Sequence, residues 1–238
     1  MIFSQAMASL KTIIILSFLV IFLSACATRP QYISKQEAFP AMYEQKPLSI
    51  LVVPAINDST AAEATDYYSA TIAPYLSYSG YYVLPLEITT DVLNNEGIQD
   101  GRQLLDVPAE KFGTMFGADA VLFVNITEWD TNYYVIGGNV SVAVAFQMKS
   151  TKTGETLWSY KARRQISTSG NSNSGGGLIG AIIETAIKTA SQDYMPIAKQ
   201  VNGIAVSTMP LGSYHPFHDK DQLVKNVHPS YITETSKL

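Results

Sequence analysis

Residues 140–148 read V-S-V-A-V-A-F-Q-M, with a larger apolar side chain at every second position. Side chains two residues apart lie on the same face of a β-strand, and five share the apolar face here: Val140, Val142, Val144, Phe146 and Met148. The turn residues T-K-T-G follow at 151–154, and residues 155–166 return with the same alternation: Trp158, Tyr160 and Ala162. This pattern predicts an antiparallel β-hairpin.

Upstream of the hairpin, three short apolar runs predict further strands. They are residues 48–54 (L-S-I-L-V-V-P), 80–86 (G-Y-Y-V-L-P-L) and 120–126 (A-V-L-F-V-N-I). The last run is apolar at nearly every position, which is typical of a strand buried on both faces. Stretches of helical character separate the runs, and this order favours parallel pairing in an α/β layer.

The first of these helices is predicted over residues 60–80. Thr60 and Glu63 fit a capping box at its start, and Pro74 is expected to kink it. Its inward face is expected to carry Tyr67, Ala70 and Tyr75. Two shorter helices are predicted at residues 89–95 and 106–117.

After the hairpin, residues 167–177 are rich in Ser, Gly and Asn and predict a flexible loop. Residues 178–194 are amphipathic at helical spacing, and Pro196 opens a last helix that runs to about residue 208. The predicted fold class is therefore α/β: a single three-layer-like domain with a mixed sheet, C-terminal helices, and an antiparallel hairpin beside a parallel strand–helix–strand core.

The amino terminus predicts an export signal. Residues 12–23 are almost wholly apolar and follow Lys11. As a helix they would span about 18 Å, well short of a hydrocarbon core of about 30 Å, so they suit a secretory signal. Translation could start at Met1 or Met7.

Cys26 is the only cysteine in the chain, so it cannot form an internal disulfide. Residues 23–26 read L-S-A-C and look like a bacterial lipobox, in which cleavage between Ala25 and Cys26 leaves a cysteine whose sulfur takes the lipid. An ordinary signal peptide with a chance cysteine is the alternative. Two or more acyl chains anchor a protein firmly. Because Ala27 rather than aspartate follows, the rule for such lipoproteins predicts the outer membrane, with the domain facing the periplasm.

Four regions follow from these patterns. Residues 1–25 are a lipoprotein signal peptide, and residues 26–46 are a lipidated amino terminus and semi-extended tether. Residues 47–210 form the α/β domain. Residues 211–238 form a polar arm or disordered tail.

Signals for chemistry are weak. A net charge of −4 gives no support to nucleic-acid binding. Gly175 to Gly180 matches G-x-G-x-x-G but follows a polar run instead of a strand, so no dinucleotide cofactor is predicted. Three histidines, with Asp219 and Asp221 beside them, could serve a metal or catalytic site: His215, His218 and His228. Three further carboxylates lie near strand ends, where ligand crevices form in α/β folds: Glu87, Asp91 and Asp130. The histidines fall in the predicted tail, where nothing would orient them, and acids at strand ends are usually caps. We therefore predict no catalytic residue, metal or cofactor, and no enzyme.

Four segments resemble, in this order after a lipobox, a family of bacterial lipoproteins without an assigned biochemical activity. They are KPLSILVVPAINDST, GYYVLPLEITTDVLNNEGI, FGADAVLFVNITEWDTNY and MKSTKTGETLWSYKA. The resemblance covers residues 47–210, and members of the family often occur beside a CsgG-like lipoprotein of the curli-secretion type. More broadly, the order is similar to the amino-terminal domain of TolB, the periplasmic part of CsgG and lipoprotein activators of penicillin-binding proteins.

The resemblance implies a lipid-anchored, non-catalytic module that docks envelope proteins, with a CsgG-like secretion complex as the expected partner. Two alternatives stay open: a pore subunit in which hairpins of several copies close a barrel, and a regulator that docks on a cell-wall synthase. The charged return strand, with Lys161, Arg163 and Arg164, favours an ordinary sheet over the pore. The loop 167–177 and the helix after it are a hypothetical surface for self-association.

Overall fold

The computed structural model describes residues 31–62, 64–134, 137–167 and 195–233. The chain divides into two compact units, residues 1–31 and 32–238, and the fold below is that of the second unit. The signal segment, the glycine motif at residues 175–180 and the predicted helix 178–194 lie outside the described residues.

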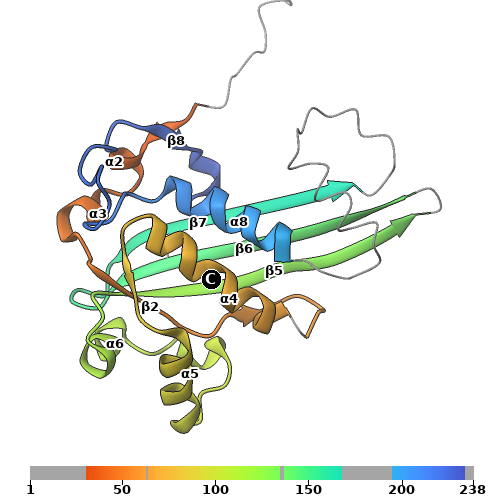
Figure 1. Cartoon of the computed structure of the whole chain (residues 1–238), viewed down its shortest axis with the longest axis horizontal. Helices are drawn as coiled ribbons and strands as arrows, with labels where there is room; N and C mark the ends of the chain where they lie inside the picture. Colours follow the sequence, from red (N-terminus) through yellow and green to blue (C-terminus); the bar gives the residue numbers. More distant parts are fainter. Residues whose placement is uncertain (1–30, 63, 135–136, 168–194, 234–238) are drawn as a thin grey trace, which may run out of the picture. The chain divides into compact units, whose positions relative to one another are not determined.

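Within the described residues, six strands form one mixed sheet in the order β4–β2–β5–β6–β7, with β3 beside β5 (Figure 1). The strands are β2 (Ser49–Val52), β3 (Ile56–Asn57), β4 (Tyr82–Val83), β5 (Ala120–Tyr134), β6 (Gly137–Ser150) and β7 (Thr156–Ser167). β2 pairs in parallel with β4 and β5, whereas β5, β6 and β7 are antiparallel. The predicted parallel core and hairpin are both confirmed, and β5 extends eight residues beyond the predicted strand end at residue 126.

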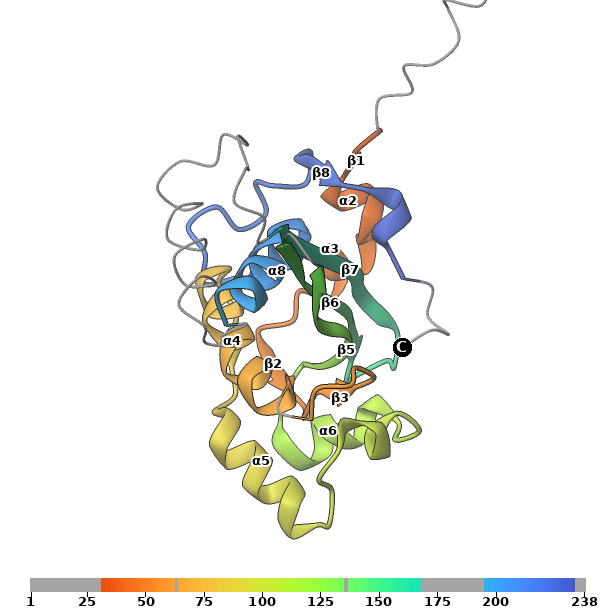
Figure 2. The same ribbon diagram turned by 90° about the vertical axis from the view of Figure 1, so that its right-hand side faces the viewer.

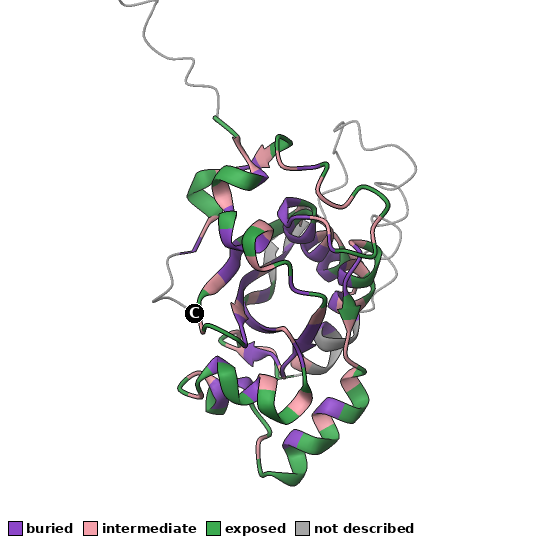
Figure 3. Cartoon of the chain, turned by 90° about the vertical axis from the view of Figure 1, so that its left-hand side faces the viewer, coloured by how far each residue is buried: buried purple, intermediate pink, exposed green. Residues whose placement is uncertain are grey.

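Helices cover both faces of this sheet. On one face lie α4 (Ala64–Tyr78) and α8 (Met195–Thr208), side by side in two views (Figures 1 and 2). The other face, over β2 and the first half of β5, packs against α5 (Leu86–Asn95), the 3₁₀ turn η1 (Gly101–Leu104) and α6 (Ala109–Phe116). Each face has its own apolar core, and buried residues gather along the strands and the helix faces turned toward them (Figure 3). The predicted α/β class is confirmed.

The apolar residues at alternate positions of β6 are buried, as the hairpin pattern predicts. Val142, Val144, Phe146 and Met148 are each at most 1% exposed and pack in the core beneath α4 and α8. Their neighbours across the ladder on β7, Trp158 and Tyr160, join the same core.

α4 starts later than predicted, and Tyr75, which was predicted to face inward, packs against the main core; the side chains of Tyr67 and Ala70 lie outside the described ones. The helix begins at Ala64 instead of Thr60, because the Asn57 side chain organises the preceding turn: its Nδ2 donates to the Ala61 carbonyl (2.6 Å) and its Oδ1 accepts from Ser59 N–H (2.9 Å). The buried face carries Tyr68, Ile72 and Leu76, and Tyr75 is only partly buried. Pro74 lies inside the helix, as predicted.

Asp119 joins the starts of two parallel strands. One carboxylate oxygen accepts from the backbone N–H groups of Leu48 and Ser49 (both 3.1 Å) and from the Ser49 hydroxyl (3.0 Å). The other forms an ion pair with Lys152 (2.8 Å). Burial on its own would raise the pKa of Asp119, but the bonds from Lys152, Ser49 and Leu48 outweigh it and hold the pKa below its ordinary value.

Replacing Asp119 with asparagine is expected to lower the free energy of unfolding by about 1–2 kcal/mol at neutral pH. A carboxyl whose folded pKa is depressed stabilises the fold above its unfolded pKa, and this contribution disappears as the pH falls through the folded value. The difference in free energy of unfolding between the wild type and Asp119→Asn should therefore become smaller below about pH 4. Urea unfolding at both pH values measures it, with Asp91→Asn on the exposed face of α5 as the control. A deficit that is equal at both pH values would contradict this role.

The two ends of the second unit are folded, contrary to the predicted tether (26–46) and tail (211–238). We call residues 32–46 the amino-terminal segment and residues 209–233 the carboxyl-terminal segment. The first holds β1 (Ile33–Ser34), α2 (Lys35–Ala38) and α3 (Pro40–Gln45), and the second holds β8 (Lys225–Val227) and the 3₁₀ turn η2 (Pro229–Tyr231). β1 and β8 pair antiparallel as a separate two-stranded sheet.

Candidate functional site

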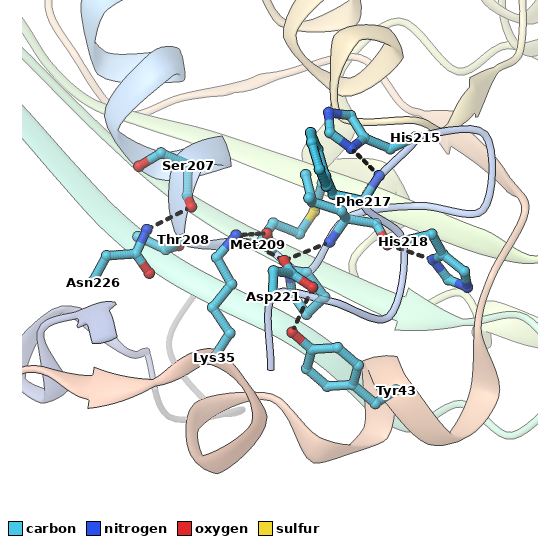
Figure 4. A network of polar contacts seen from close by, with 12 residues as sticks. Lys35, Tyr43, Ser207, Thr208, Met209, His215, Phe217, His218, Asp221 and Asn226 are labelled. Atoms are coloured by element: carbon cyan, nitrogen blue, oxygen red, sulfur yellow. Dashed lines mark hydrogen bonds and ion pairs between the residues drawn. The ribbon is translucent and has the colours of Figure 1, made fainter. Parts of the chain in front are cut away.

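The two terminal segments meet at a buried ion pair. Lys35 Nζ lies 3.0 Å from Asp221 Oδ2 and donates to the Met209 carbonyl (2.8 Å), and both charged side chains are only 6% exposed. Asp221 also accepts from the Tyr43 hydroxyl (3.1 Å) and from Leu211 N–H (3.0 Å). We call these five residues the terminal junction. Figure 4 shows Lys35 and Tyr43 approaching Asp221 from the amino-terminal segment.

Local structure places each partner. The Ser34 hydroxyl caps α2 by accepting from Glu37 N–H (3.2 Å), which sets Lys35 at the first helical position. Phe39 and Met42 are 3% and 2% exposed and fix the following turns on the main core. The backbones of the two segments also bond directly, from Lys35 N–H to the Val224 carbonyl and from Gln36 N–H to the Gln222 carbonyl (both 3.1 Å).

Two phenols complete the polar network. Burial raises the pKa of Tyr43, and the nearby carboxylates of Asp221 and Asp219 raise it further. The Tyr81 hydroxyl donates to the Pro210 carbonyl (2.7 Å), and burial likewise raises its pKa. Both phenols therefore stay neutral and act as donors. This arrangement fixes the amino- and carboxyl-terminal segments to each other and to the core.

The carboxyl-terminal segment also presses against the end of α4. Gly212 N–H donates to the Ser79 carbonyl (2.8 Å), and Tyr214 N–H donates to the Gly80 carbonyl (3.1 Å). Gly80 has a φ of +88°, and a Cβ there would lie 2.4 Å from the backbone nitrogen of His215. Only a glycine permits this approach.

Gly80→Ala should accordingly destabilise the fold by about 2–3 kcal/mol, through overpacking and a left-handed backbone together. Gly97→Ala is the matched control, because Gly97 has a similar φ of +82° with no heavy atom within 4 Å of the added Cβ. That variant should lose only about 1 kcal/mol. Thermal or urea unfolding of both variants tests the difference, and equal losses would show that the contact with the carboxyl-terminal segment is unimportant.

The structure orients all three histidines, contrary to expectation. The Nδ1 atoms of His215 and His228 accept from the backbone N–H groups of Phe217 (3.1 Å) and Ser230 (3.3 Å), and His218 Nδ1 lies 2.8 Å from the Leu211 carbonyl. Each ring is thus held by nearby backbone. Over the described ranges, no group of three or more His, Cys, Asp or Glu side chains is arranged to hold a metal ion.

The carboxylates considered in the sequence are not brought into one site. Glu87 and Asp91 are exposed one turn apart on α5, and Asp130 is exposed on β5. Two other carboxylates form ion pairs that the sequence did not indicate: Asp58 with Arg102 (2.6 Å) and Glu128 with Arg163 (2.7 Å).

Hydrogen bonds from Arg102 and Asn125 lower the pKa of Asp58, and the guanidinium of Arg163 lowers the pKa of Glu128. Both shifts favour the charged form, which is the opposite of what a general acid needs. These pairs therefore act as structural contacts.

Ala25 and Cys26, the predicted cleavage and lipidation residues, lie outside the described residues. Across the parts of the chain that the structure describes, none of the helices combines the length and hydropathy needed to cross a membrane.

Comparison with known proteins identifies relatives of the whole domain. The family described as "Putative lipoprotein GNA1162-like" matches residues 38–215. A relative from Neisseria meningitidis serogroup B (strain ATCC BAA-335 / MC58), "Putative lipoprotein NMB1124/NMB1162", is 30% identical over 186 residues, which is 78% of this chain and 84% of the relative.

One solved structure supports this match. The crystal structure of lipoprotein GNA1162 from Neisseria meningitidis is 33% identical, with a TM-score of 0.51, and the match covers 60% of this chain and 97% of that one. The PelC dodecamer from Paraburkholderia phytofirmans is more distant, at 16% identity and a TM-score of 0.42 over 70% of this chain and 90% of that one. The resemblance to a bacterial lipoprotein family is confirmed: the chain belongs to the GNA1162-like family of putative lipoproteins.

Proposed function

We propose that this protein is a lipid-anchored envelope protein, in which removal of residues 1–25 exposes Cys26 and fatty chains are attached through its sulfur. One observation carries the proposal: the sequence L-S-A-C at residues 23–26, at the end of an apolar signal, in a chain of a lipoprotein family. Ala27 after the cysteine supports the outer membrane as the destination and the periplasm as the side of the domain.

The proposed role is that of a non-catalytic assembly or interaction module. The buried and half-buried charges described above are neutralised within the fold, at Lys35–Asp221, Asp119–Lys152 and Glu128–Arg163. Such pairs hold charged side chains in fixed positions, which supports a rigid shape suited to docking.

The terminal junction suits an anchored module. Any pull between the membrane and the domain passes through the amino-terminal segment, which the junction and the Phe39 contacts fix to the core. A domain held close to its anchor in this way moves with it, which favours repeated encounters with partners in the same membrane. We propose envelope proteins as those partners, with a CsgG-like lipoprotein or a second copy of the chain as the first to examine.

Metabolic labelling tests the anchor. Cells that express the full chain with radioactive palmitate should label the wild-type protein and leave the Cys26→Ser variant unlabelled. The variant should also keep residues 1–25 and leave the outer-membrane fraction. An unlabelled wild type, or a variant with unchanged processing and fractionation, would contradict the proposal.

Affinity purification from detergent-solubilised envelopes tests the role. The wild type should retain outer-membrane proteins that the Cys26→Ser variant, displaced from the outer membrane, does not. Recovery of a CsgG-like lipoprotein supports the secretion complex, whereas recovery of a cell-wall synthase points to regulation of that enzyme instead. Turnover of an envelope substrate by the purified protein would overturn the non-catalytic role.

A further inference from the structure

Exposed apolar side chains occur on both terminal segments, within a few residues of the backbone pairing between β1 and β8. Tyr32 and Tyr231 are 47% and 51% exposed, and their rings lie 5.5 Å and 5.0 Å from the ring of His228 between them. Leu223 is 83% exposed and Val224 is 45% exposed. We call Tyr32, Leu223, Val224 and Tyr231 the terminal apolar patch.

The parts of this patch are held together by backbone pairing. Ile33 pairs with Val227 across β1 and β8, which sets Tyr32 beside His228. The Val224 carbonyl accepts from Lys35 N–H (3.1 Å), one helical turn before the buried core residue Phe39. The patch is therefore a fixed surface of the fold.

Chain length places this patch close to the proposed anchor. Tyr32 follows Cys26 by six residues, and each residue spans at most about 3.6 Å, so their α-carbons lie within about 22 Å of each other in any conformation. A cysteine with acyl chains in the bilayer lies at the membrane surface. Tyr32, the patch residue nearest to Cys26 in the sequence, therefore lies within about 22 Å of the anchored residue.

The composition of the patch fits a bilayer surface. Tyrosine is favoured at the membrane–water boundary, because its ring can enter the headgroup layer while its hydroxyl stays hydrated. Leucine and valine gain free energy on leaving water for the acyl boundary. The exposed neighbours include both Glu37 and Lys225, so the contact depends on apolar area and not on net charge.

We propose that the terminal apolar patch lies against the phospholipid surface in which Cys26 is anchored, as a second point of contact that sets the orientation of the domain. This proposal rests on the lipidation of Cys26. The domain then points α5 and α6 away from the membrane, since these helices lie at the opposite end of the fold from β1 and β8 (Figures 1 and 2).

Site-directed spin labelling tests the contact in the full lipidated protein. Acylation consumes the only cysteine, so Leu223→Cys adds a single thiol for a nitroxide. Met115→Cys on α6 is the matched control, because Met115 is also an exposed apolar residue (54%). Each protein is reconstituted in vesicles of phosphatidylethanolamine and phosphatidylglycerol. Collision rates are then measured with oxygen, which concentrates in lipid, and with a water-soluble nickel chelate.

The ratio of oxygen to nickel accessibility should be several-fold higher at position 223 than at position 115, and raising the salt concentration should not change it. Val224→Cys, labelled in the same way, should agree with position 223. If the ratios at positions 223 and 115 are equal in protein that floats with the vesicles, the proposed membrane contact of the patch is wrong, while the lipid anchor at Cys26 still holds. Protein that fails to float, and whose residue 26 itself takes the label, overturns the anchor and the patch together.

Discussion

Replacing Asp221 with alanine is expected to lower the free energy of unfolding by about 3–5 kcal/mol, because it leaves the buried Lys35 ammonium without its counter-charge. The change also removes the acceptor for Leu211 N–H and for the Tyr43 hydroxyl. Urea unfolding of the mature chain with Cys26→Ser, which excludes effects of the lipid, measures the loss.

Asp219→Ala is the matched control, two residues away. Asp219 pairs with Lys46, but their side chains are 35% and 47% exposed, so water screens this pair and the variant should lose much less stability than Asp221→Ala. Similar losses of stability in Asp221→Ala and Asp219→Ala would show that burial does not strengthen the contribution of the terminal junction to stability.

A double-mutant cycle separates the ion pair from the other contacts. Lys35→Met alone should destabilise the fold, because it leaves a buried carboxylate unpaired. In the Asp221→Ala background the same change should cost far less, since the ammonium that it removes is already without a partner. Additive losses would mean that the two charges do not interact across the junction.

Trp158→Ala is also expected to lower the free energy of unfolding, by about 3–5 kcal/mol. Here the loss comes from the apolar core against which the amino-terminal segment packs. Trp158 is 1% exposed on β7, with its ring 6.4 Å from Phe39 and 5.6 Å from Phe146. Its indole N–H donates to the Thr208 hydroxyl (3.3 Å) at the end of α8. One side chain thus joins the amino-terminal segment, the sheet and the last helix.

The loss should be accompanied by a local effect. Without Trp158, Phe39 loses an aromatic contact, and amide hydrogens of residues 35–45 should exchange faster than those of β5 and β6. Trp158→Phe keeps most of the apolar volume and should recover a large part of the stability. A fold that keeps normal exchange in residues 35–45 would show that Phe39 does not depend on this contact.

The sheet could be predicted from the sequence because its signals are local. Strict alternation from Val140 to Met148 can be satisfied only by a strand with one buried face, and the T-K-T-G turn fixes its partner. The runs that contain β2, β4 and the start of β5 are short and mostly apolar, so they could also be predicted as strands, whereas the two-residue strand β3 was not predicted. The buried residues Tyr68, Ile72 and Leu76 of α4 were not predicted, because apolar residues occur on several faces of this helix.

The terminal junction could not be predicted, because its partners lie far apart in the sequence. Lys35 and Asp221 are 186 residues apart, and although Asp221 was considered together with the nearby histidines, neither residue indicates the other as its partner. A weaker signal was present in A-F-P-A-M-Y at residues 38–43, where Phe39 and Met42 have helical spacing and Pro40 suits a first helical position. That signal predicts a short helix but does not reveal what covers it.

The mass of the amino-terminal peptide of the purified protein tests the central claim most directly. The peptide should begin at residue 26, and its mass should exceed that of the bare sequence by the mass of fatty acyl chains on the cysteine. A peptide that still contains residues 1–25, or one that begins elsewhere with an unmodified thiol at Cys26, would contradict the account.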